Sequence, residues 1–187
     1  MDEWQAWRRT LKLTYMDEKR DHGSPPPASV ALLAAGVPHR VFRHAGPLRS
    51  LEQAASERGQ AVGQVVRCIL FRLGRDGERE WVLVATAGPD NLPWKALRAH
   101  LGRSRISMAT PEEVLAVTGA PVGAVSPFTL RPAEDERLRL IIEPSVLAHE
   151  EVSLGSGERG VGIVMQSADL RDAMMAMGAE VVALKDA

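Results

Sequence analysis

The sequence has only one cysteine, Cys68, in 187 residues. A single cysteine excludes a disulfide within the chain and a zinc site built from several thiolates. No apolar run approaches the roughly 20 residues that a membrane-spanning helix needs, and the first residues lack the apolar core of a secretory signal peptide. These absences lead us to expect a soluble protein of the cytoplasm.

The length and composition predict one globular domain with a short extension. Hydrophobic residues make up 45% of the chain and charged residues 25%, which is ordinary for a globular domain. The chain is too short for two domains of the usual size. Residues 1–27 end in the breaker cluster HGSPPP, so we interpret them as an N-terminal extension with a stiff Pro-rich linker. Residues 28–187 then form the domain.

The net charge of −1 conceals an uneven distribution. Residues 28–110 carry 12 Lys and Arg against 6 Asp and Glu, whereas residues 111–187 carry 6 against 13. A basic half favours a polyanionic partner such as RNA. The acidic half argues against a protein that coats nucleic acid without specificity.

Hydrophobic periodicity and breaker residues predict helices interspersed with strands. Helices are expected at 28–35, 51–58, 94–101, 111–117 and from 167 onwards. Strands are expected at 38–44, 65–72, 81–87, 104–108, 138–143, 150–154 and 161–165. The strands at 65–72 and 81–87 are the most apolar, and we expect them to form a central hairpin.

Residues 118–127, TGAPVGAVSP, are the segment that suggests a site. Two glycines and two prolines within ten residues exclude a regular helix or a central strand. Glycine lets a ligand approach the backbone and proline stiffens the following turn. We therefore interpret Gly123 to Pro127 as a rigid loop whose amides can hold a polar or anionic group. The alternative is a plain connection after a helix that ends at Gly119.

Arg67 is an unusual residue for an apolar strand. Strand alternation places it on one face with Val65, Ile69 and Phe71. A buried guanidinium must be paired, or must line a cavity that receives an anion. Both interpretations stay open: Arg67 binds a ligand, or it pairs with a carboxylate such as Glu143 or reaches solvent at the strand start.

The order of these segments resembles the YbaK-type aminoacyl-tRNA deacylases, which include the editing domain inserted in bacterial prolyl-tRNA synthetases. The likeness covers residues 28–184. It is carried by the strand VVRCILFR, by the G-x-x-x-P pattern at Gly123 and Pro127, and by the glycine-rich turn with Gly155, Gly157 and Gly160.

The resemblance implies an α/β (α+β) single domain whose mixed, largely antiparallel sheet forms a partial barrel flanked by helices. It implies a trans-editing hydrolase that deacylates mischarged aminoacyl-tRNA, with tRNA-Pro bearing a small wrong amino acid as the expected substrate. The implied partners are the CCA end of the aminoacyl-tRNA and prolyl-tRNA synthetase, and no metal or other cofactor is expected. Backbone amides can stabilise the oxyanion of such a reaction, and a small pocket acts as a second sieve.

The resemblance also supplies the candidate residues. The candidate catalytic residues are Arg67, Gly123 and Ser126. The candidate substrate-binding residues are His44, Ala124, Val125, Pro127, Gly155 and Gly157. The family normally has a lysine where this chain has Arg67. Arginine keeps the charge but cannot lose its proton to act as a base, so a noncatalytic homologue that binds tRNA or a synthetase is the alternative function.

Several residues also have a structural interpretation. A lone histidine such as His44 is commonly structural, and Cys68 is expected to be a buried, inert thiol. Ser126 lacks the G-x-S-x-G context of a serine hydrolase. The turn GSGERG precedes a strand, whereas a dinucleotide fingerprint opens a helix, so we reject a nucleotide fold of that kind.

Overall fold

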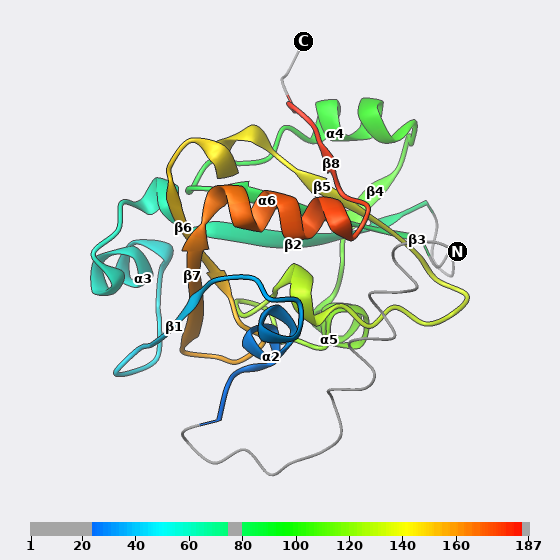
Figure 1. Ribbon diagram of the computed structural model, residues 1–187. Helices are drawn as coiled ribbons and strands as arrows, with labels where there is room; N and C mark the ends of the chain where they lie inside the picture. Colours follow the sequence, from blue (N-terminus) through cyan, green and yellow to red (C-terminus); the bar gives the residue numbers. More distant parts are fainter. Residues whose placement is uncertain (1–23, 75–79, 185–187) are drawn as a thin grey trace.

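The computed structural model describes residues 24–74 and 80–184 (Figure 1). The extension expected at 1–27 therefore lies outside the described residues, apart from its last four. The helices are α2 (Pro27–Ala34), α3 (Leu51–Arg58), α4 (Trp94–Leu101), α5 (Pro111–Thr118) and α6 (Ser167–Ala176), with the 3-10 helices η1 (Val62–Gln64), η2 (Pro127–Thr129) and η3 (Pro144–Leu147). Within the described part, no helix is both long and apolar enough to cross a membrane.

The strands form two sheets that are joined at one point. The strands are β1 (Arg40–Arg43), β2 (Val66–Leu73), β3 (Glu80–Ala87), β4 (Ile106–Met108), β5 (Arg137–Ile142), β6 (Glu151–Gly155), β7 (Val161–Gln166) and β8 (Glu180–Val181). The smaller sheet has the order β1-β7-β6 and is antiparallel. The larger has the order β4-β2-β3-β5-β8, in which β5 pairs in parallel with β3 and β8. Val65 and Ser153 form a parallel bridge between the sheets.

The predicted α/β class with mixed, largely antiparallel pairing is confirmed. The strands are divided between two sheets, and the described residues form no closed barrel. The central hairpin of β2 and β3 pairs in antiparallel register from Val66 opposite Ala87 to Arg72 opposite Trp81. This hairpin is the centre of the larger sheet.

Local signals explain why α3 and α5 begin and end where they do. The side chain of Ser50 accepts a hydrogen bond from the N–H of Gln53 at the start of α3. Thr110 and Glu113 exchange side-chain to main-chain hydrogen bonds at the start of α5, which is a capping box. Gly119 ends α5 in the left-handed conformation, where glycine has no steric penalty. These ends were predicted from the sequence.

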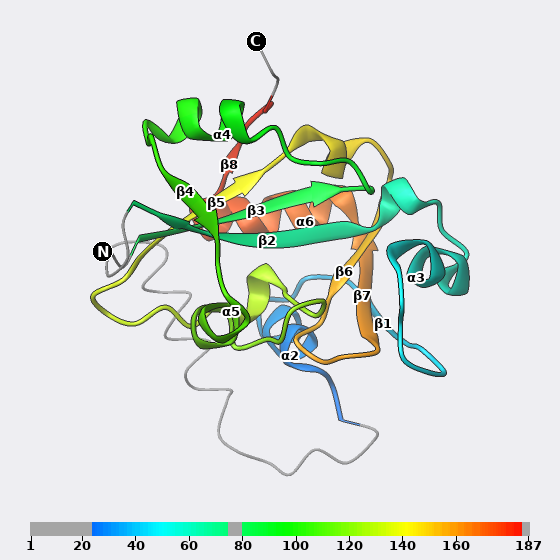
Figure 2. The same cartoon turned by 180° about the vertical axis from the view of Figure 1, so that it is seen from behind.

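The larger sheet is covered on both faces (Figures 1 and 2). One core cluster joins the sheet to α2, α5 and α6, and includes Leu83 and Leu170. The second cluster joins the other face to α4, and includes Val84 and Leu97. Because successive residues of a strand point to opposite faces, β3 contributes side chains to both clusters.

The edge of β2 is only partly covered by a neighbouring strand. β4 pairs with residues 71–73 of β2, so residues 66–70 form an edge that no strand of the larger sheet covers. α5 lies below this edge in Figure 2, and β6 crosses near the beginning of β2. The uncovered part of β2 forms one wall of the site described next.

Candidate functional site

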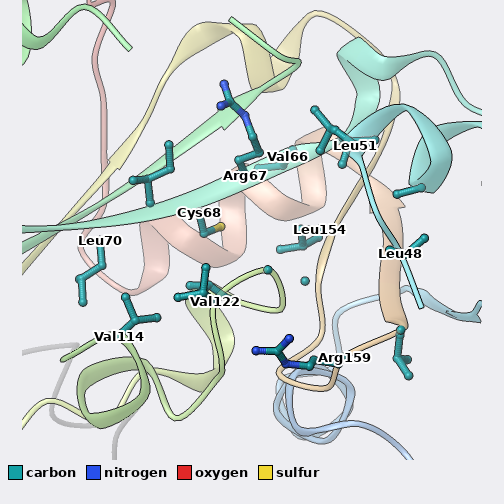
Figure 3. A pocket seen from close by; sticks show the side chains of 18 of the residues that line it. Leu48, Leu51, Val66, Arg67, Cys68, Leu70, Val114, Val122, Leu154 and Arg159 are labelled. Carbon is teal, nitrogen blue, oxygen red and sulfur yellow. The ribbon is translucent and has the colours of Figure 1, made fainter. Parts of the chain in front are cut away.

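A cavity of about 700 Å³ lies beside the uncovered edge of β2 (Figure 3). Its walls come from four parts of the chain, which are residues 47–58, residues 65–70, residues 108–125 and the β6–β7 region at 154–161. This volume falls within the usual range for small-molecule pockets, roughly 300–1,000 Å³. The cavity therefore has room for a nucleotide-sized group.

The charged residues of the cavity wall all carry positive charge. Arg58, Arg67 and Arg159 line the cavity, and no aspartate or glutamate does so among the described residues. A concave site lined by one sign of charge concentrates the opposite sign. The cavity is therefore suited to an anionic ligand.

Arg58, the last residue of α3, is held firmly in the wall. Its Nη1 donates a 2.9 Å hydrogen bond to the Oγ of Ser153 on β6. A Cβ added to Gly162 would lie 2.4 Å from Nη2, so the guanidinium rests directly on the backbone of β7. Burial lowers the pKa of Arg58, and the charge of Glu57 acts in the opposite direction.

Arg159 is the wall arginine whose side chain is unpaired within residues 24–74 and 80–184. It lies in the turn between β6 and β7, and Figure 3 shows its guanidinium directed back into the cavity. Its neighbour Glu158 pairs with Arg43 at 3.3 Å, and no described residue forms a hydrogen bond or ion pair with the Arg159 side chain. An unpaired guanidinium in a cavity wall can grip a phosphate in a bidentate manner.

Arg67 lines the cavity but its side chain leaves β2 on the side opposite to Cys68 (Figure 3). Its Nη2 donates a hydrogen bond to the main-chain oxygen of Asp90. Burial lowers the pKa of Arg67, and the charge of Asp90 raises it. The carboxylate of Glu143, which the sequence offered as a partner, accepts instead from the N–H of Ser145 at 2.8 Å.

The loop at 122–125 contributes main-chain atoms to the cavity wall. Gly123 and Val125 both line it, and no described residue accepts a hydrogen bond from the N–H of either. The N–H of Ala124 between them donates to the oxygen of Pro121 at 3.0 Å. Gly123 has φ 87° and a Cβ there would meet no atom within 4 Å. The wall thus contains two unpaired donors that can bind an oxyanion.

Two predicted glycines support this loop from behind. The N–H of Gly157 donates a 2.8 Å hydrogen bond to the oxygen of Ala124. A Cβ on Gly155 would lie 2.4 Å from the oxygen of Val125, so only glycine permits this approach. Gly155 also lines the cavity, whereas Gly157 does not.

Ser126 and Pro127 lie behind the loop. Ser126 is fully buried and its Oγ accepts from the N–H of Phe128 at 3.4 Å. Pro127 is the first residue of η2. Neither residue lines the cavity, and neither does Ala124. Of the candidate residues, Arg67, Gly123, Val125 and Gly155 therefore line one cavity. Ala124, Ser126, Pro127 and Gly157 do not line it but lie in or against the same loop.

His44 lies directly after β1 and outside the cavity. Its side chain is buried, and Nδ1 lies 2.5 Å from the Oε2 of Glu57 on α3. The ring also packs edge-on against Phe42, with a centroid distance of 4.9 Å. These contacts connect β1 to α3.

The side of the cavity nearest α5 is apolar. Figure 3 shows Cys68 and Leu70 on the same side of β2, facing Val114 of α5 and Val122. Burial raises the pKa of the Cys68 thiol to about 12, so the thiol is neutral at physiological pH. The prediction of an inert thiol agrees with this pKa. The residue itself is half-buried and not buried as expected, because it lines the cavity, a position that was not predicted.

The sequence interpretation missed Arg58, Arg159 and Val122 as wall residues. The sequence did contain an indication for Arg159, because an arginine between two turn glycines lies close to a backbone that a ligand can approach. Arg58 had none, since a basic residue in the last turn of a helix is ordinary. Within residues 24–74 and 80–184, no cluster of three or more His, Cys, Asp or Glu side chains could hold a metal ion.

Comparisons with known proteins agree with this geometry. The model of the aminoacyl-tRNA editing domain matches residues 45–173, which include the walls of the cavity. The multifunctional Ser/Thr-tRNA deacylase ProXp-y of Escherichia coli K12 is 28% identical over 142 residues, covering 75% of this chain and 82% of that protein. The proline–tRNA ligase of Thermosipho melanesiensis is 33% identical over 88 residues, which are 47% of this chain and only 15% of the ligase.

Two solved structures share the fold. A hypothetical protein, APE2540, superposes with a TM-score of 0.69 at 24% identity, covering 83% of this chain and 96% of that chain. A protein described as a candidate trans-editing enzyme for prolyl tRNA synthetase superposes with a TM-score of 0.65 at 25% identity, covering 80% and 87%. These likenesses show the fold, and the family match across the whole cavity shows the family: the chain belongs to the aminoacyl-tRNA editing domain family.

Proposed function

We propose that this protein is a trans-editing hydrolase that deacylates mischarged tRNA-Pro bearing a small wrong amino acid. One observation carries the proposal: a cavity of about 700 Å³ combines arginines, an absence of carboxylates among its described wall residues, and the unpaired N–H groups of Gly123 and Val125. This combination suits the CCA end of an aminoacyl-tRNA, which brings phosphate, ribose and an ester carbonyl. Prolyl-tRNA synthetase is the proposed upstream partner that makes the error.

The chemistry follows from the two main-chain donors. The ester carbonyl oxygen accepts hydrogen bonds from Gly123 and Val125 while a water molecule attacks the carbonyl carbon. The tetrahedral intermediate then collapses, the carbon–oxygen bond to the ribose breaks, and the ribose oxygen receives a proton. The neighbouring ribose hydroxyl helps to activate the water. Preorganised donors of this kind are worth about 10²–10³ in kcat.

The remaining candidate residues have supporting roles in this proposal. Arg67 contacts the terminal nucleotide at the edge of β2, where its permanent charge serves binding and not proton transfer. Ser126 and Pro127 fix the end of the catalytic loop through η2. His44 stabilises the wall indirectly, because it binds Glu57 of α3.

The direct test is deacylation of a panel of mischarged tRNAs. The purified protein is incubated with tRNA-Pro carrying alanine, cysteine or serine, and with correctly charged tRNA-Pro. We expect release of at least one wrong amino acid and retention of proline. Release no faster than in buffer for every substrate would reject the enzymatic function.

Arg67→Lys is the second test of the proposal. If arginine has replaced a lysine while the pocket adapted to it, the variant loses activity. If arginine suppresses the chemistry, the variant gains activity. Arg72→Lys is a matched control on the same strand, because Arg72 pairs with Glu113 at 2.7 Å and does not line the cavity.

A noncatalytic binder of tRNA or a synthetase is the second candidate function. This candidate is favoured by the hydrogen bond that Arg67 donates to the main-chain oxygen of Asp90. The bond engages a guanidinium that an editing enzyme would use to hold its substrate. Binding of tRNA that weakens with salt, without any deacylation, would support this candidate. Deacylation that disappears in Gly123→Val would exclude it, since φ 87° at Gly123 disfavours a β-branched residue.

A further inference from the structure

The main chain of β2 points alternately toward its partner β3 and toward its uncovered edge. The N–H of Gly88, directly after β3, donates a 3.0 Å hydrogen bond to the oxygen of Val65. In an antiparallel pair, hydrogen bonds to one partner come from every second residue of a strand. Since Val65 bonds toward β3, the N–H and C=O groups of Cys68 point the other way, to the edge where residues 66–70 have no neighbouring strand in the larger sheet.

Two further hydrogen bonds lead to the same orientation of Cys68. Ala85 lies opposite Cys68 in the register of β2 and β3, and its oxygen accepts from the N–H of Glu143 at 2.9 Å, so Ala85 bonds toward the β5 side. The oxygen of Leu70 accepts from the N–H of Ala109 at 3.0 Å on the edge side. Within residues 24–74 and 80–184, neither main-chain group of Cys68 has a hydrogen-bond partner. The edge therefore offers a donor and an acceptor, side by side, to the cavity that Cys68 lines.

This polar pair is surrounded by apolar side chains. Cys68 and Leu70 face Val114 and Val122, and the Arg159 guanidinium lies on the other side of the cavity (Figure 3). A phosphate has no apolar face to pack here, and an aliphatic side chain has no polar edge. A nucleobase has two apolar faces and an edge that carries donors and acceptors. The position beside Cys68 is therefore suited to a base whose phosphate is directed toward Arg159.

We infer that the main-chain N–H of Cys68 donates to N1 of the terminal adenine and that its C=O accepts from the 6-amino group. The inference rests on the proposed function, which brings the 3′-terminal adenosine of tRNA to this cavity. N1 and the 6-amino group form the edge of adenine farthest from the ribose, so the ribose is left near the loop at 122–125. Figure 3 shows Arg67 on one side of β2 and Val122 on the other, so a base that continues the sheet lies between them.

This arrangement selects adenine over hypoxanthine. Hypoxanthine carries an N–H at position 1 and an oxygen at position 6, so a donor would face the Cys68 N–H and an acceptor would face its C=O. A site that hydrogen-bonds its ligand rejects an analogue without the matching groups by about tenfold or more. Because both recognising groups belong to the main chain, replacement of the Cys68 side chain alone leaves them in place.

The experiment compares nucleotides on the full-length protein. Affinities for AMP, IMP, 1-deaza-AMP and 7-deaza-AMP are measured by NMR titration. 1-Deaza-AMP lacks the N1 acceptor, whereas 7-deaza-AMP keeps both N1 and the 6-amino group. We expect AMP and 7-deaza-AMP to bind with similar affinity, and IMP and 1-deaza-AMP to bind more weakly by about tenfold or more. Equal affinities of AMP and 1-deaza-AMP, or no binding of AMP, would overturn the inference.

Cys68→Pro is the variant that removes the N–H, and proline is tolerated on an edge strand where the N–H is not used. The preference for AMP over 1-deaza-AMP should disappear in this variant, whereas Cys68→Ala keeps the N–H and should retain the preference. If Cys68→Pro does not fold, the affinities of the wild type decide alone. The mischarged-tRNA assay is independent of these affinities. Discrimination among the nucleotides without ester hydrolysis would reject the proposed activity and support the inference, whereas hydrolysis with equal affinities would do the reverse.

Discussion

The carbonyl oxygen of Ala124 accepts a 2.8 Å hydrogen bond from the main-chain N–H of Gly157. This bond connects the loop that carries the two free donors to the turn that carries Arg159. The loop and the turn also approach closely at Gly155, where an added Cβ would lie 2.4 Å from the main-chain oxygen of Val125. The loop and the turn therefore depend on each other for their positions.

Gly155→Ala should displace this loop. Because the added methyl group meets backbone and not a movable side chain, we expect a loss of about 1–3 kcal/mol in the free energy of unfolding and a larger proportional loss of deacylation. Urea denaturation and kcat/KM measure the two effects. Gly46→Ala is the control, since a Cβ there meets no atom within 4 Å and should change stability by less than about 0.5 kcal/mol. Equal behaviour of the two variants would contradict the supporting role.

Arg159→Ala should weaken tRNA binding without unfolding the domain. Its side chain has no partner among the described residues, so its loss should raise KM about tenfold and make the log–log slope of binding against salt shallower by about 1. Arg171→Ala is the matched control, because Arg171 lies on α6 outside the cavity and pairs with its neighbour Asp172. An unchanged salt slope for Arg159→Ala would show that this arginine does not meet a phosphate.

Thr110→Ala should loosen the helix that precedes the loop. Thr110 Oγ1 accepts from the N–H of Glu113 at 3.3 Å, and Glu113 Oε2 accepts from the N–H of Thr110 at 2.8 Å. Loss of this cap should cost about 1 kcal/mol in the free energy of unfolding. Thr110→Ser keeps the oxygen and should retain most of the stability. Thermal unfolding of both variants tests the expectation, which would be wrong if they melted together.

Stability should fall at alkaline pH through Cys68. Burial raises the pKa of its thiol from 9.0 to about 12, so the folded state retains a proton that the unfolded state loses. The resulting stabilisation is complete below pH 9 and declines as the pH rises toward 12. At pH 10 the loss relative to neutral pH is at most about 1.4 kcal/mol. Urea denaturation of wild type and Cys68→Ala at pH 7.5 and pH 10 measures it, and parallel declines would contradict the assignment.

The ends of helices were predictable because their determinants are close in sequence. Thr110, Pro111 and Glu113 predict the start of α5, and the structure has the same capping box. Seven of the described strands were predictable from apolar runs, with ends shifted by at most two residues, whereas the two-residue strand β8 was not predicted. Strand alternation also placed Arg67 correctly with Ile69 and Phe71, which pack on the α4 side of the sheet.

The composition of the cavity wall was not predictable in the same way. Arg58 and Ser153 are 95 residues apart in sequence, and no local pattern pairs them. Which side of β2 faces the cavity depends on how α5 and β6 pack, so the sequence could not show that Cys68 and not the Arg67 guanidinium points toward Val122. The unpaired donors of Gly123 and Val125 were anticipated as accessible amides, whereas the partner of Ala124 in the distant turn was not.

The bridge between Val65 and Ser153 has a consequence for how this domain can change. Residues 66–70 belong to the larger sheet, while residues 154 and 155 belong to the smaller one, and both groups line the same cavity. A slight rotation of one sheet against the other near this junction would change the volume of the cavity without replacing any side chain in its wall. Substitutions far from the cavity can therefore change its size.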